Sequence, residues 1–404
     1  MAKPNLHFAS LSTTAKSTLK QLKLSEAATF LRGSSLSKDD VREVADVSNG
    51  VPCVLYGHLY TTYGEIAYSS KYVTDAEIDE KVTSKAGDVL MPTSDVTPRG
   101  LATATCVMFD NAIVGGDINI LRPQPGIDGR YLSLAINSQK QKLYPLIVGS
   151  TIRHLHASDL KGLSYFFPSI EEQQKIAEFF TALDEKIELS IKKYNLFSSL
   201  KKAYASVVFD SLIDCQKLAI GEIANTFAGA TPSTSKKEFW ENGAIPWMSS
   251  GEINKRYIHS VEKNITQSGY DNSSTKWVRR GTTLIAIAGQ GSTRGKVAFT
   301  EIDLCTNQSL VAIECDNNIV LDKFLFFFLE TQYGFLRSLS DSGGGRGGLN
   351  LGLINGIKVP IPSLNRQREV IELFESIDHR IDLTNKMVSL LALQKKAFMQ
   401  RMFV

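Results

Sequence analysis

The sequence is poor in cysteine and in long apolar runs, and each absence excludes a class of protein. Its five cysteines in 404 residues include no C-x-x-C pair, and their number is odd. A disulfide framework and a cysteine zinc site are therefore disfavoured, and we expect buried thiols in a reducing cytosol. The apolar run Phe324–Leu329 ends at Glu330. Because a membrane-spanning helix needs about 20 apolar residues, this run predicts a buried helix or strand instead.

Strong charge, a secretory leader and catalytic motifs are also lacking. The formal net charge is only +3, so charge alone does not argue for a nucleic-acid partner. No apolar stretch follows the N-terminal lysines, so no secretory signal is predicted. The sequence has no N-P-P-[YF] or D-P-P-[YF] run, no F-x-G-x-G cofactor loop and no clear nuclease pattern, and Gln290 stands where a Walker A loop needs glycine. We therefore expect a chain that catalyses no reaction and holds no cofactor or metal.

What the sequence does contain is an internal repeat at an offset of 194 residues. Residues 162–209 and 356–403 align without a gap, and the alignment pairs Gln173 with Gln367. A register held over this length is typical of a structural unit that is built twice. Two similar units in one chain usually recognise two things, or two halves of one thing.

Each copy predicts a long helix that starts near a proline, Pro168 or Pro362, and contains no later glycine or proline up to Phe209 or Val404. Apolar residues recur at alternating steps of three and four, which is the spacing of a coiled-coil seam. A helix of about 38 residues is roughly 57 Å long and cannot bury this stripe in one small domain. We therefore expect the two helices to pair as an antiparallel coiled-coil spacer with pseudo-two-fold symmetry.

The predicted seam and partner-binding positions are Ile176, Phe180, Leu183, Ile187 and Tyr194 in the first helix and Val370, Phe374, Ile377, Ile381 and Val388 in the second, and the stripe continues at Phe197, Tyr204, Val208, Leu391, Phe398 and Met402. Polar residues interrupt it at the same two places in both copies, Ser190 and Lys201 in the first and Thr384 and Lys395 in the second. Such residues fix helix register at some cost in stability. The alternative is two unrelated core helices.

Two larger segments, rich in Gly, Ser, Thr and β-branched residues, accompany the helices. Turns followed by short apolar runs, as at 87–91 and 281–287, are typical of buried strands. We therefore predict an α+β fold in which two globular domains alternate with two long helices. The predicted segments are 1–163 and 213–357 for the domains and 164–212 and 358–404 for the helices. Apart from similar openings at Lys23 and Lys217, the two domains are expected to differ in content.

Four motifs in a fixed order carry a family resemblance. They are PSIEEQQKIAE at 168–178, VLYGHLYTTYGEI at 54–66, IPWMSSGEI at 245–253 and GQGSTRGKV at 289–297. Together they resemble motifs of the DNA-specificity subunits of type I restriction-modification enzymes, in which two target recognition domains alternate with two similar helices. His58 departs from the family pattern, which has Asp at this position. The resemblance covers nearly the whole chain except its first twenty residues.

The resemblance implies a sequence-specific DNA-binding subunit in a cytoplasmic defence against foreign DNA. Each recognition domain would read one half of an asymmetric bipartite site in double-stranded DNA. The paired helices would hold the half-sites about one helical turn, ~34–36 Å, apart. The implied partners are two copies of a DNA adenine methyltransferase subunit, which would bind S-adenosylmethionine, and motor-nuclease subunits where present, which would bind ATP and Mg²⁺. No membrane partner is implied.

Candidate DNA-binding residues are side chains whose donors and acceptors suit base edges or phosphates, as Arg suits guanine. The loop 289–296 places several between glycines, where the backbone can approach DNA. A second glycine-rich loop contains Arg346, which is either a phosphate contact or part of a disordered tip. The candidates are Thr61, Thr62, Tyr63, Thr93, Ser94 and Arg99 in the first domain and Trp247, Gln290, Ser292, Thr293, Arg294, Lys296 and Arg346 in the second.

Several alternatives stay open. Arg294 could pair with Glu301 and only hold its loop, which would then be a plain exposed connection. His154 and His156 have a spacing compatible with metal binding, but a strand face is favoured because no Cys, His or Asp cluster accompanies them. For the whole chain, the alternatives are a helical scaffold that binds two protein partners without DNA and a nucleic-acid enzyme with an unrecognised site.

Overall fold

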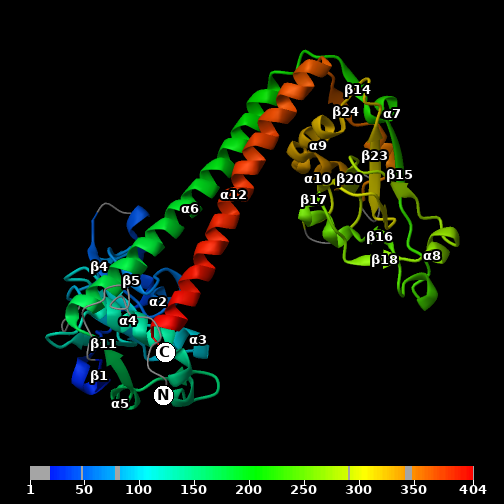
Figure 1. The fold of residues 1–404 in the computed structure, drawn as a ribbon. Helices are drawn as coiled ribbons and strands as arrows, with labels where there is room; N and C mark the ends of the chain where they lie inside the picture. The colour runs from blue at the N-terminus through cyan, green and yellow to red at the C-terminus, as the bar shows by residue number, and fades with distance from the viewer. Residues whose placement is uncertain (1–18, 47–48, 78–81, 290–291, 342–347, 404) are drawn as a thin grey trace, which may run out of the picture. The chain divides into compact units, whose positions relative to one another are not determined.

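The computed structural model describes residues 19–46, 49–77, 82–289, 292–341 and 348–403. The chain forms two compact units, and each combines one globular domain with parts of both long helices (Figure 1). Unit 1 comprises residues 1–191 and 386–404, and unit 2 comprises residues 192–385. The candidates Gln290 and Arg346 lie outside the described residues.

The two long helices are α6 (Ile170–Asp210, 41 residues) and α12 (Leu364–Met402, 39 residues). Each begins directly after a serine that follows the predicted proline. The hydroxyl oxygen of Ser169 lies 3.4 Å from a backbone N–H of the first turn of α6, and that of Ser363 lies 3.4 Å from the equivalent N–H of α12. A serine oxygen in this place satisfies a helix N–H that has no partner within the helix. Both helices then continue without interruption, as predicted.

A buried glutamine ties the first turn of each long helix to the globular domain. The Gln173 amide donates to the carbonyls of Pro168 (2.9 Å) and Gly126 (3.1 Å) and accepts from the Asp128 N–H (3.0 Å). The Gln367 amide makes the equivalent set, donating to the carbonyls of Pro362 (3.0 Å) and Ile319 (3.0 Å) and accepting from the N–H of Leu321 (2.8 Å). The identical glutamines of the repeat therefore have identical structural roles.

In unit 1 the described strands form a larger and a smaller sheet. The larger sheet has the order β2-β11-β7-β9-β5, in which β5 is parallel to β9 and the other neighbours are antiparallel. The smaller sheet has the order β10-β4-β6-β3, in which β10 is parallel to β4. The other described strands of unit 1 form two short antiparallel pairs, β1-β13 and β12-β8.

The strands of unit 1 are β1 (Lys20–Lys23), β2 (Ala28–Arg32), β3 (Val41–Glu43), β4 (Val51–Val54), β5 (Ile66–Ala67), β6 (Tyr72–Thr74), β7 (Asp88–Pro92), β8 (Ser94–Asp95), β9 (Thr105–Val107), β10 (Ile113–Val114), β11 (Ile118–Pro123), β12 (Arg153–His154) and β13 (Ser164–Phe167). Its shorter helices are α1 (Leu24–Ala27), α2 (His58–Thr61), α3 (Pro98–Leu101), α4 (Gly129–Ser138) and α5 (Ala157–Lys161), with 3₁₀ turns η2 (Lys38–Asp40), η3 (Val44–Asp46), η4 (Lys140–Lys142) and η5 (Tyr144–Leu146).

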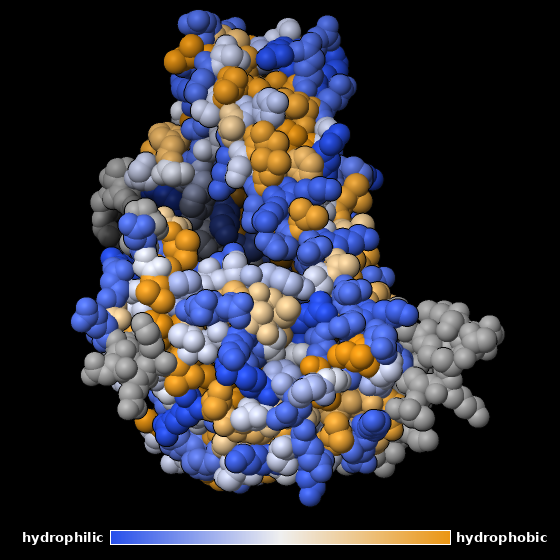
Figure 2. Space-filling view, turned by 90° about the vertical axis from the view of Figure 1, so that its left-hand side faces the viewer, coloured by the Kyte–Doolittle hydropathy of each residue, from blue (hydrophilic) through white to orange (hydrophobic). Residues whose placement is uncertain are grey.

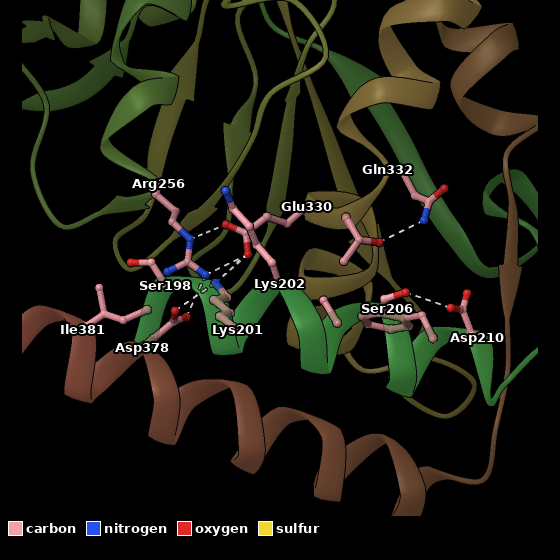
Figure 3. A pocket seen from close by; sticks show the side chains of 13 residues that line it. Ser198, Lys201, Lys202, Ser206, Asp210, Arg256, Glu330, Gln332, Asp378 and Ile381 are labelled. Carbon is pink, nitrogen blue, oxygen red and sulfur yellow. Dashed lines mark hydrogen bonds and ion pairs between the residues drawn. The ribbon is translucent and has the colours of Figure 1, made fainter. Parts of the chain in front are cut away.

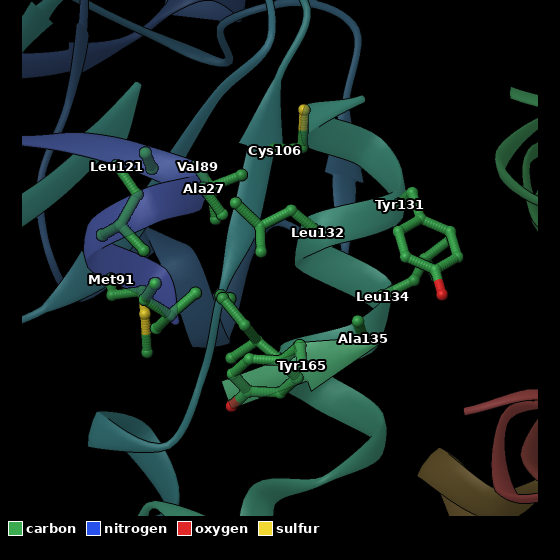
Figure 4. Packing of buried hydrophobic residues seen from close by; sticks show 14 of the residues in the cluster. Ala27, Val89, Met91, Cys106, Leu121, Tyr131, Leu132, Leu134, Ala135 and Tyr165 are labelled. Carbon is green, nitrogen blue, oxygen red and sulfur yellow. The ribbon is translucent and has the colours of Figure 1, made fainter. Parts of the chain in front are cut away.

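The core of unit 1 forms where α4 packs on the larger sheet (Figure 4). Leu132 of α4 and Val89 of β7 belong to this cluster, and Phe180 of α6 joins it. The rings of Phe179 and Phe398 meet edge to face at 5.2 Å. The start of α6 therefore packs against the end of α12, so the two helices run antiparallel in this unit.

Unit 2 has the same kind of architecture. Its larger sheet has the order β15-β23-β20-β21-β17, with β17 parallel to β21, and its smaller sheet has the order β18-β16-β22-β19, with β16 parallel to β22. A short pair, β14-β24, matches β1-β13 of unit 1.

The strands of unit 2 are β14 (Lys217–Ala219), β15 (Ala224–Ala228), β16 (Ile245–Met248), β17 (Tyr257–Ile258), β18 (Lys263–Ile265), β19 (Trp277–Val278), β20 (Thr283–Ala286), β21 (Val297–Thr300), β22 (Leu304–Thr306), β23 (Leu310–Cys315) and β24 (Lys358–Pro360). Its shorter helices are α7 (Ile220–Ile223), α8 (Gln267–Asp271), α9 (Asp322–Thr331), α10 (Tyr333–Asp341) and α11 (Leu351–Asn355), with 3₁₀ turns η6 (Lys237–Phe239) and η7 (Ser250–Lys255).

The apolar run Phe324–Leu329 forms the buried part of α9, as expected for a core segment. Phe209 near the end of α6 stacks on Phe374 near the start of α12, with ring centroids 5.9 Å apart. These contacts show that the helices are antiparallel in unit 2 as well. The five cysteines are free thiols, of which three are buried and two half-buried. Burial raises the pKa of the Cys305 thiol to about 11, so it stays protonated and unreactive at neutral pH.

The globular domains differ less than the sequence predicted. Both larger sheets have matching strand orders, and each smaller sheet contains one parallel pair, β4-β10 in unit 1 and β16-β22 in unit 2. Strand β4 and strand β16 are related by the offset of 194, as are α5 and α11. The main difference is that β3 extends one smaller sheet beside β6, whereas β19 extends the other beside β22. The fold was thus duplicated with the helices, and the two copies differ in their side chains and in the strand that extends the smaller sheet.

The predicted apolar stripe is buried only near the helix ends. Phe180 and Phe374 are at most 1% exposed, whereas Tyr194 is 36% and Tyr204 is 45% exposed. The prediction that these tyrosines lie in a buried seam is wrong. A straight helix drifts by about 20° per heptad from a 3.5-residue repeat, and Ala205 is buried in place of Tyr204. Of the other predicted positions, Ile176, Val370 and Ile377 are buried, and Leu183, Ile187, Ile381 and Val388 are half-buried.

Apolar side chains on the face drawn in Figure 2 are scattered among polar ones. Among the helices of the described residues, none combines the length and the hydropathy needed to cross a membrane.

Candidate nucleic-acid interface

The structure brings part of the first candidate set together. Tyr63 and Arg99 line one cleft of about 290 Å³ in unit 1, and Tyr60 and Lys140 line it with them. Arg99 is exposed, and burial lowers the pKa of Lys140. Two cations beside two phenols form a surface able to contact phosphates and bases.

Thr61 and Thr62 have local partners, whereas the buried hydroxyl oxygen of Thr93 has none among the described residues. Thr61 donates to the carbonyl of Gly57 (2.8 Å), and the hydroxyl of Thr62 lies 2.7 Å from that of Tyr72. Both threonines are exposed. Thr93 is half-buried and is not among the residues that line the Arg99 cleft.

Ser94 contributes to a histidine site rather than to this cleft. Its hydroxyl lies 3.0 Å from Nδ1 of His154, in the strand pair β12-β8. The His154 and His156 rings stack at 6.0 Å. No group of three or more His, Cys, Asp or Glu side chains suited to a metal ion occurs among the described residues. His154 lies in strand β12, as favoured, whereas His156 is the residue directly before α5 and lies outside the strand.

His58, which departs from the family motif, is a structural acceptor. Its Nδ1 accepts the N–H of Leu55 (3.1 Å), and its ring stacks on Tyr72 at 3.5 Å. Burial, with a smaller effect from Lys38, lowers the pKa of His58 to about 4. The neutral ring can therefore accept a backbone N–H, as a carboxylate at this position could.

In unit 2, Lys296 lines a cleft of about 260 Å³ with Asn254 and Tyr333. The Lys296 ammonium donates to Oδ1 of Asn254 (2.6 Å), and Tyr333 donates to the carbonyl of Ser292 (3.0 Å). Gly295 has a φ of 84°, a conformation that favours glycine, so the turn needs this residue. The described part of the loop, residues 292–296, therefore forms a defined turn with polar groups on its surface.

The alternative for Arg294 was an ion pair with Glu301. The structure places Arg280 (3.5 Å) and Lys323 (3.9 Å) beside Glu301. Arg294 itself is half-buried, and so is Thr293 beside it. These positions leave the DNA-binding role of Arg294 as a prediction.

Trp247 does not fit a direct DNA contact. Its side chain is 5% exposed, packs edge to face on Trp240 at 5.0 Å, and donates its indole N–H to the carbonyl of Ala230 (3.0 Å). The family-like IPWM segment is therefore strand β16 of the smaller sheet of unit 2, and its tryptophan packs in the interior.

The two family-like segments nevertheless occupy equivalent places. Residues 54–66 run from β4 through α2 to β5, and residues 245–253 run from β16 into η7, which leads to β17. Glu65, near the end of the first segment, and Arg256, three residues after the second, both contact a long helix. Each candidate DNA cleft is lined by a glutamate that also contacts the long helices. This residue is Glu65 in unit 1 and Glu330 in unit 2.

An ionic cluster, the unit 1 junction (Glu65, Asp184 and Lys395), joins the globular domain to both helices. The Lys395 ammonium lies 2.6 Å from Oε2 of Glu65 and 2.6 Å from Oδ1 of Asp184. Burial favours a higher pKa for Glu65, but the charge and hydrogen bond of Lys395 outweigh it and leave the pKa below its usual value. Burial raises the pKa of Asp184, because it outweighs the effect of the shared lysine.

A second cluster, the unit 2 junction (Lys201, Arg256, Glu330 and Asp378), has the same plan (Figure 3). The Lys201 ammonium lies 2.8 Å from Oε2 of Glu330 and 2.9 Å from Oδ1 of Asp378. Arg256 binds the same two carboxylates, at 2.9 Å from Glu330 and 2.7 Å from Asp378. Tyr257 adds a hydrogen bond to Asp378 (2.9 Å). Burial favours a higher pKa for Glu330, but the hydrogen bonds and charges of Arg256 and Lys201 together outweigh it and hold the pKa below its usual value.

Each junction borders a cleft, of about 490 Å³ in unit 1 and about 670 Å³ in unit 2. Equivalent residues at the offset of 194 line the two clefts: Asp184, Ile187, Lys395 and Lys396 in unit 1, and Asp378, Ile381, Lys201 and Lys202 in unit 2. Sequence reasoning found the two lysines only as interruptions of the apolar stripe. That they recur at the same position was the available signal for a shared ionic contact.

Two copies of one α+β domain on antiparallel helices, each with a polar cleft beside its junction, define a protein with two related binding domains. A family model for the type I restriction modification DNA specificity domain matches residues 16–196 and again residues 213–391. The chain belongs to this family.

The relatives agree with this assignment. The chain is 28% identical over 212 residues to the EcoR124I/EcoR124II specificity subunit of Escherichia coli, covering 50% of each protein. It is 29% identical over 171 residues to the type I restriction enzyme MjaIX specificity subunit of Methanocaldococcus jannaschii, covering 41% of this chain and 38% of the relative. The chain thus spans half or less of the length of these curated relatives.

A solved structure shows the same fold. The crystal structure of the type I restriction-modification system S subunit from Mycoplasma genitalium superposes with a TM-score of 0.66 at 18% identity, covering 100% of this chain and 99% of that one. The fold predicted from the repeat, with two domains alternating with two long paired helices, is therefore confirmed.

Proposed function

We propose that this chain is the DNA-recognition subunit of a type I restriction-modification complex and that each globular domain reads one half of an asymmetric, bipartite target in double-stranded DNA. The observation that carries the proposal is the duplication of one fold with different side chains at the equivalent clefts. The first cleft contains Tyr63, Arg99 and Lys140, and the second contains Asn254 and Lys296. Two similar scaffolds with different polar groups suit two different half-sites.

We further propose that the chain itself is not catalytic and binds two copies of a DNA adenine methyltransferase subunit in the cytoplasm. Four leucines on the long helices support the copy number, because they occur as pairs at the repeat offset. Leu189 and Leu383 are 58% and 51% exposed, and Leu196 and Leu390 are both 57% exposed. Repeated apolar surfaces suit two identical partners.

Chemistry would then belong to those partners. The methyltransferase subunits would hold S-adenosylmethionine and act on adenines flipped out of the duplex. Motor-nuclease subunits, where present, would hold ATP and Mg²⁺. The residues of this chain would bind, orient and space the DNA.

The test is DNA binding by the complex of this chain with its methyltransferase partner. Methylation mapping in cells that carry both proteins identifies the target. Affinities for the mapped site and for a scrambled site are then measured at two salt concentrations. We expect the mapped site to bind about 10³-fold or more tightly, and both affinities to fall as salt rises. The same measurements are made on Lys296→Ala, which removes a cation from the second cleft. Lys237→Ala, at a lysine outside both clefts, is the matched surface control.

The scaffold alternative predicts a different result. A helical adaptor that never touches DNA would assemble with its partners but would give no preference for any sequence and no dependence of specificity on this chain. Equal affinity for mapped and scrambled sites would therefore reject DNA recognition.

A further inference from the structure

The two junctions place a lysine of one long helix between an aspartate of the other helix and a glutamate of the globular domain. The lysines, Lys395 and Lys201, are only 15% and 16% exposed in their side chains. Each lies within 2.9 Å of both carboxylates. Each junction therefore joins three separate parts of the fold through one ammonium group.

In the junctions, the side chains from the long helices obey the repeat offset, whereas the glutamates from the globular domains do not. Asp184 and Asp378 are related by the repeat offset, and so are the two lysines. The glutamates are not related in this way, since Glu65 comes just before β5 and Glu330 lies in α9. Position 137 of α4, which is equivalent to Glu330 of α9, is an asparagine. Two non-equivalent parts of the domains thus deliver a carboxylate to the same place on the helices.

Stability alone does not account for this arrangement. Buried ion clusters often stabilise no more than well-packed apolar residues, because their charges must be removed from water. Arg256 also has a φ of 65°, a left-handed conformation that is strained for a residue with a side chain. What a cluster of short charged hydrogen bonds supplies is a fixed direction between the elements that it joins.

We propose that the two junctions are positioning contacts that set the orientation of each recognition domain on the helices, and that they thereby determine which spacing between half-sites the subunit accepts. This inference rests on the proposed function. Glu65 and Glu330 are positioning residues, since they act through the helix lysines and not through contact with DNA bases. Any recognition domain that replaces one of these must bring its own carboxylate to the lysine.

The test compares the isosteric variants Glu65→Gln and Glu330→Gln in the assembled complex. Methylation rates are measured on the mapped target and on targets with one base pair more or less between the half-sites. One base pair changes the separation by ~3.4 Å and the relative rotation by roughly 35°. We expect each variant to reduce the preference for the native spacing by about tenfold or more, because small misplacements of reacting groups have large effects on rate. Base preferences within each half-site should be unchanged.

Asp88→Asn is the matched control. Asp88 is buried and pairs with Arg122 at 2.8 Å, entirely within the first globular domain. Its loss should lower thermal stability at least as much as Glu65→Gln does, yet leave the spacing preference within about twofold of the original. Glu65→Asp, which keeps the charge, should restore part of the preference lost in Glu65→Gln.

The outcomes separate the two levels of inference. A wild-type complex without sequence-specific methylation would reject the proposed function and this inference with it. If the wild type discriminates between spacings and both glutamine variants keep that discrimination, the positioning role is wrong. Equal rate losses on all spacings, accompanied by lower stability, would also reject it and leave the junctions a purely structural role.

Discussion

Replacing Gln173 with alanine should detach the start of α6 from the globular domain of unit 1. The side chain is 1% exposed, and its three hydrogen bonds reach two carbonyls and the N–H of Asp128. Asp128 is the N-cap of α4, so the glutamine connects the first turns of a long helix and a core helix. Gln367, which is 0% exposed, makes the equivalent connection in unit 2.

The expected loss follows from the groups left without partners. Alanine leaves the N–H of the half-buried Asp128, the carbonyl of the buried Pro168 and the carbonyl of the exposed Gly126 without their side-chain partner. A buried polar group without a partner costs about 1–3 kcal/mol, and carbonyls tolerate it better than N–H groups do. The free energy of unfolding of unit 1 should therefore fall by about 3 kcal/mol. Gln173→Glu should be no better, because its carboxylate would face two carbonyl oxygens.

Hydrogen exchange, read by mass spectrometry, resolves the effect by unit. A loss of about 3 kcal/mol should speed exchange of the α4 amides roughly 100-fold where exchange follows opening of the unit. Gln367→Ala should do the same for α9. The control is Gln124→Ala, which removes one exposed bond to Thr29 (2.8 Å) and should change stability by less than about 0.5 kcal/mol. Unchanged α4 exchange in Gln173→Ala would refute the reasoning, as would equal acceleration in α4 and α9.

Three further predictions concern recognition. Inserting four residues after Asn195, matched by four after Thr384 in the antiparallel helix, adds ~6 Å and about 40° of rotation; methylation mapping should find the same half-sites with a longer spacer, and the original spacer at full activity would contradict a ruler role. Replacing 213–357 with the matching domain of another specificity subunit should change one half-site, and a change in both would exclude independent reading. Arg294→Ala should weaken binding to the mapped site by about 1–3 kcal/mol and reduce the preference at one base of the second half-site. Lys296→Ala should weaken binding to all DNA sequences alike and lower the slope of affinity against salt by about one. If Arg294→Ala weakens binding to all single-base variants of the site by the same factor, Arg294 does not read a base.

The helices were predictable because their signals are local and repeated. A proline near each start, the absence of glycine and proline over about 40 residues, and a period near 3.5 residues all point to the same element. The buried positions of the seam were less predictable. In a straight helix of this length, residues spaced every 3.5 positions gradually rotate away from the face that packs on the partner helix. Tyr204 is exposed and Ala205 buried for this reason.

The likeness of the two globular domains was missed because it lies in topology and not in residue identity. Strand β4 and strand β16 share the repeat offset, but their sequences, VPCV and IPWM, share one residue. Strand order depends on which apolar surfaces pack together, and many residue combinations satisfy the same packing. Trp247 was misjudged on similar grounds, since a motif identifies a segment without saying which of its side chains are buried.

Among the positions that stayed identical in the two copies are polar residues that connect elements. Gln173 and Gln367 tie helix starts to domain helices, and Lys201 and Lys395 tie one long helix to the other and to a domain. The residues at the candidate DNA clefts, such as Arg99 and Lys296, differ between the copies. A frame held by a few buried polar contacts leaves the reading surface free to vary. Substitution at the clefts should therefore alter which DNA is read with little loss of stability, whereas substitution at the frame contacts should alter stability or spacing.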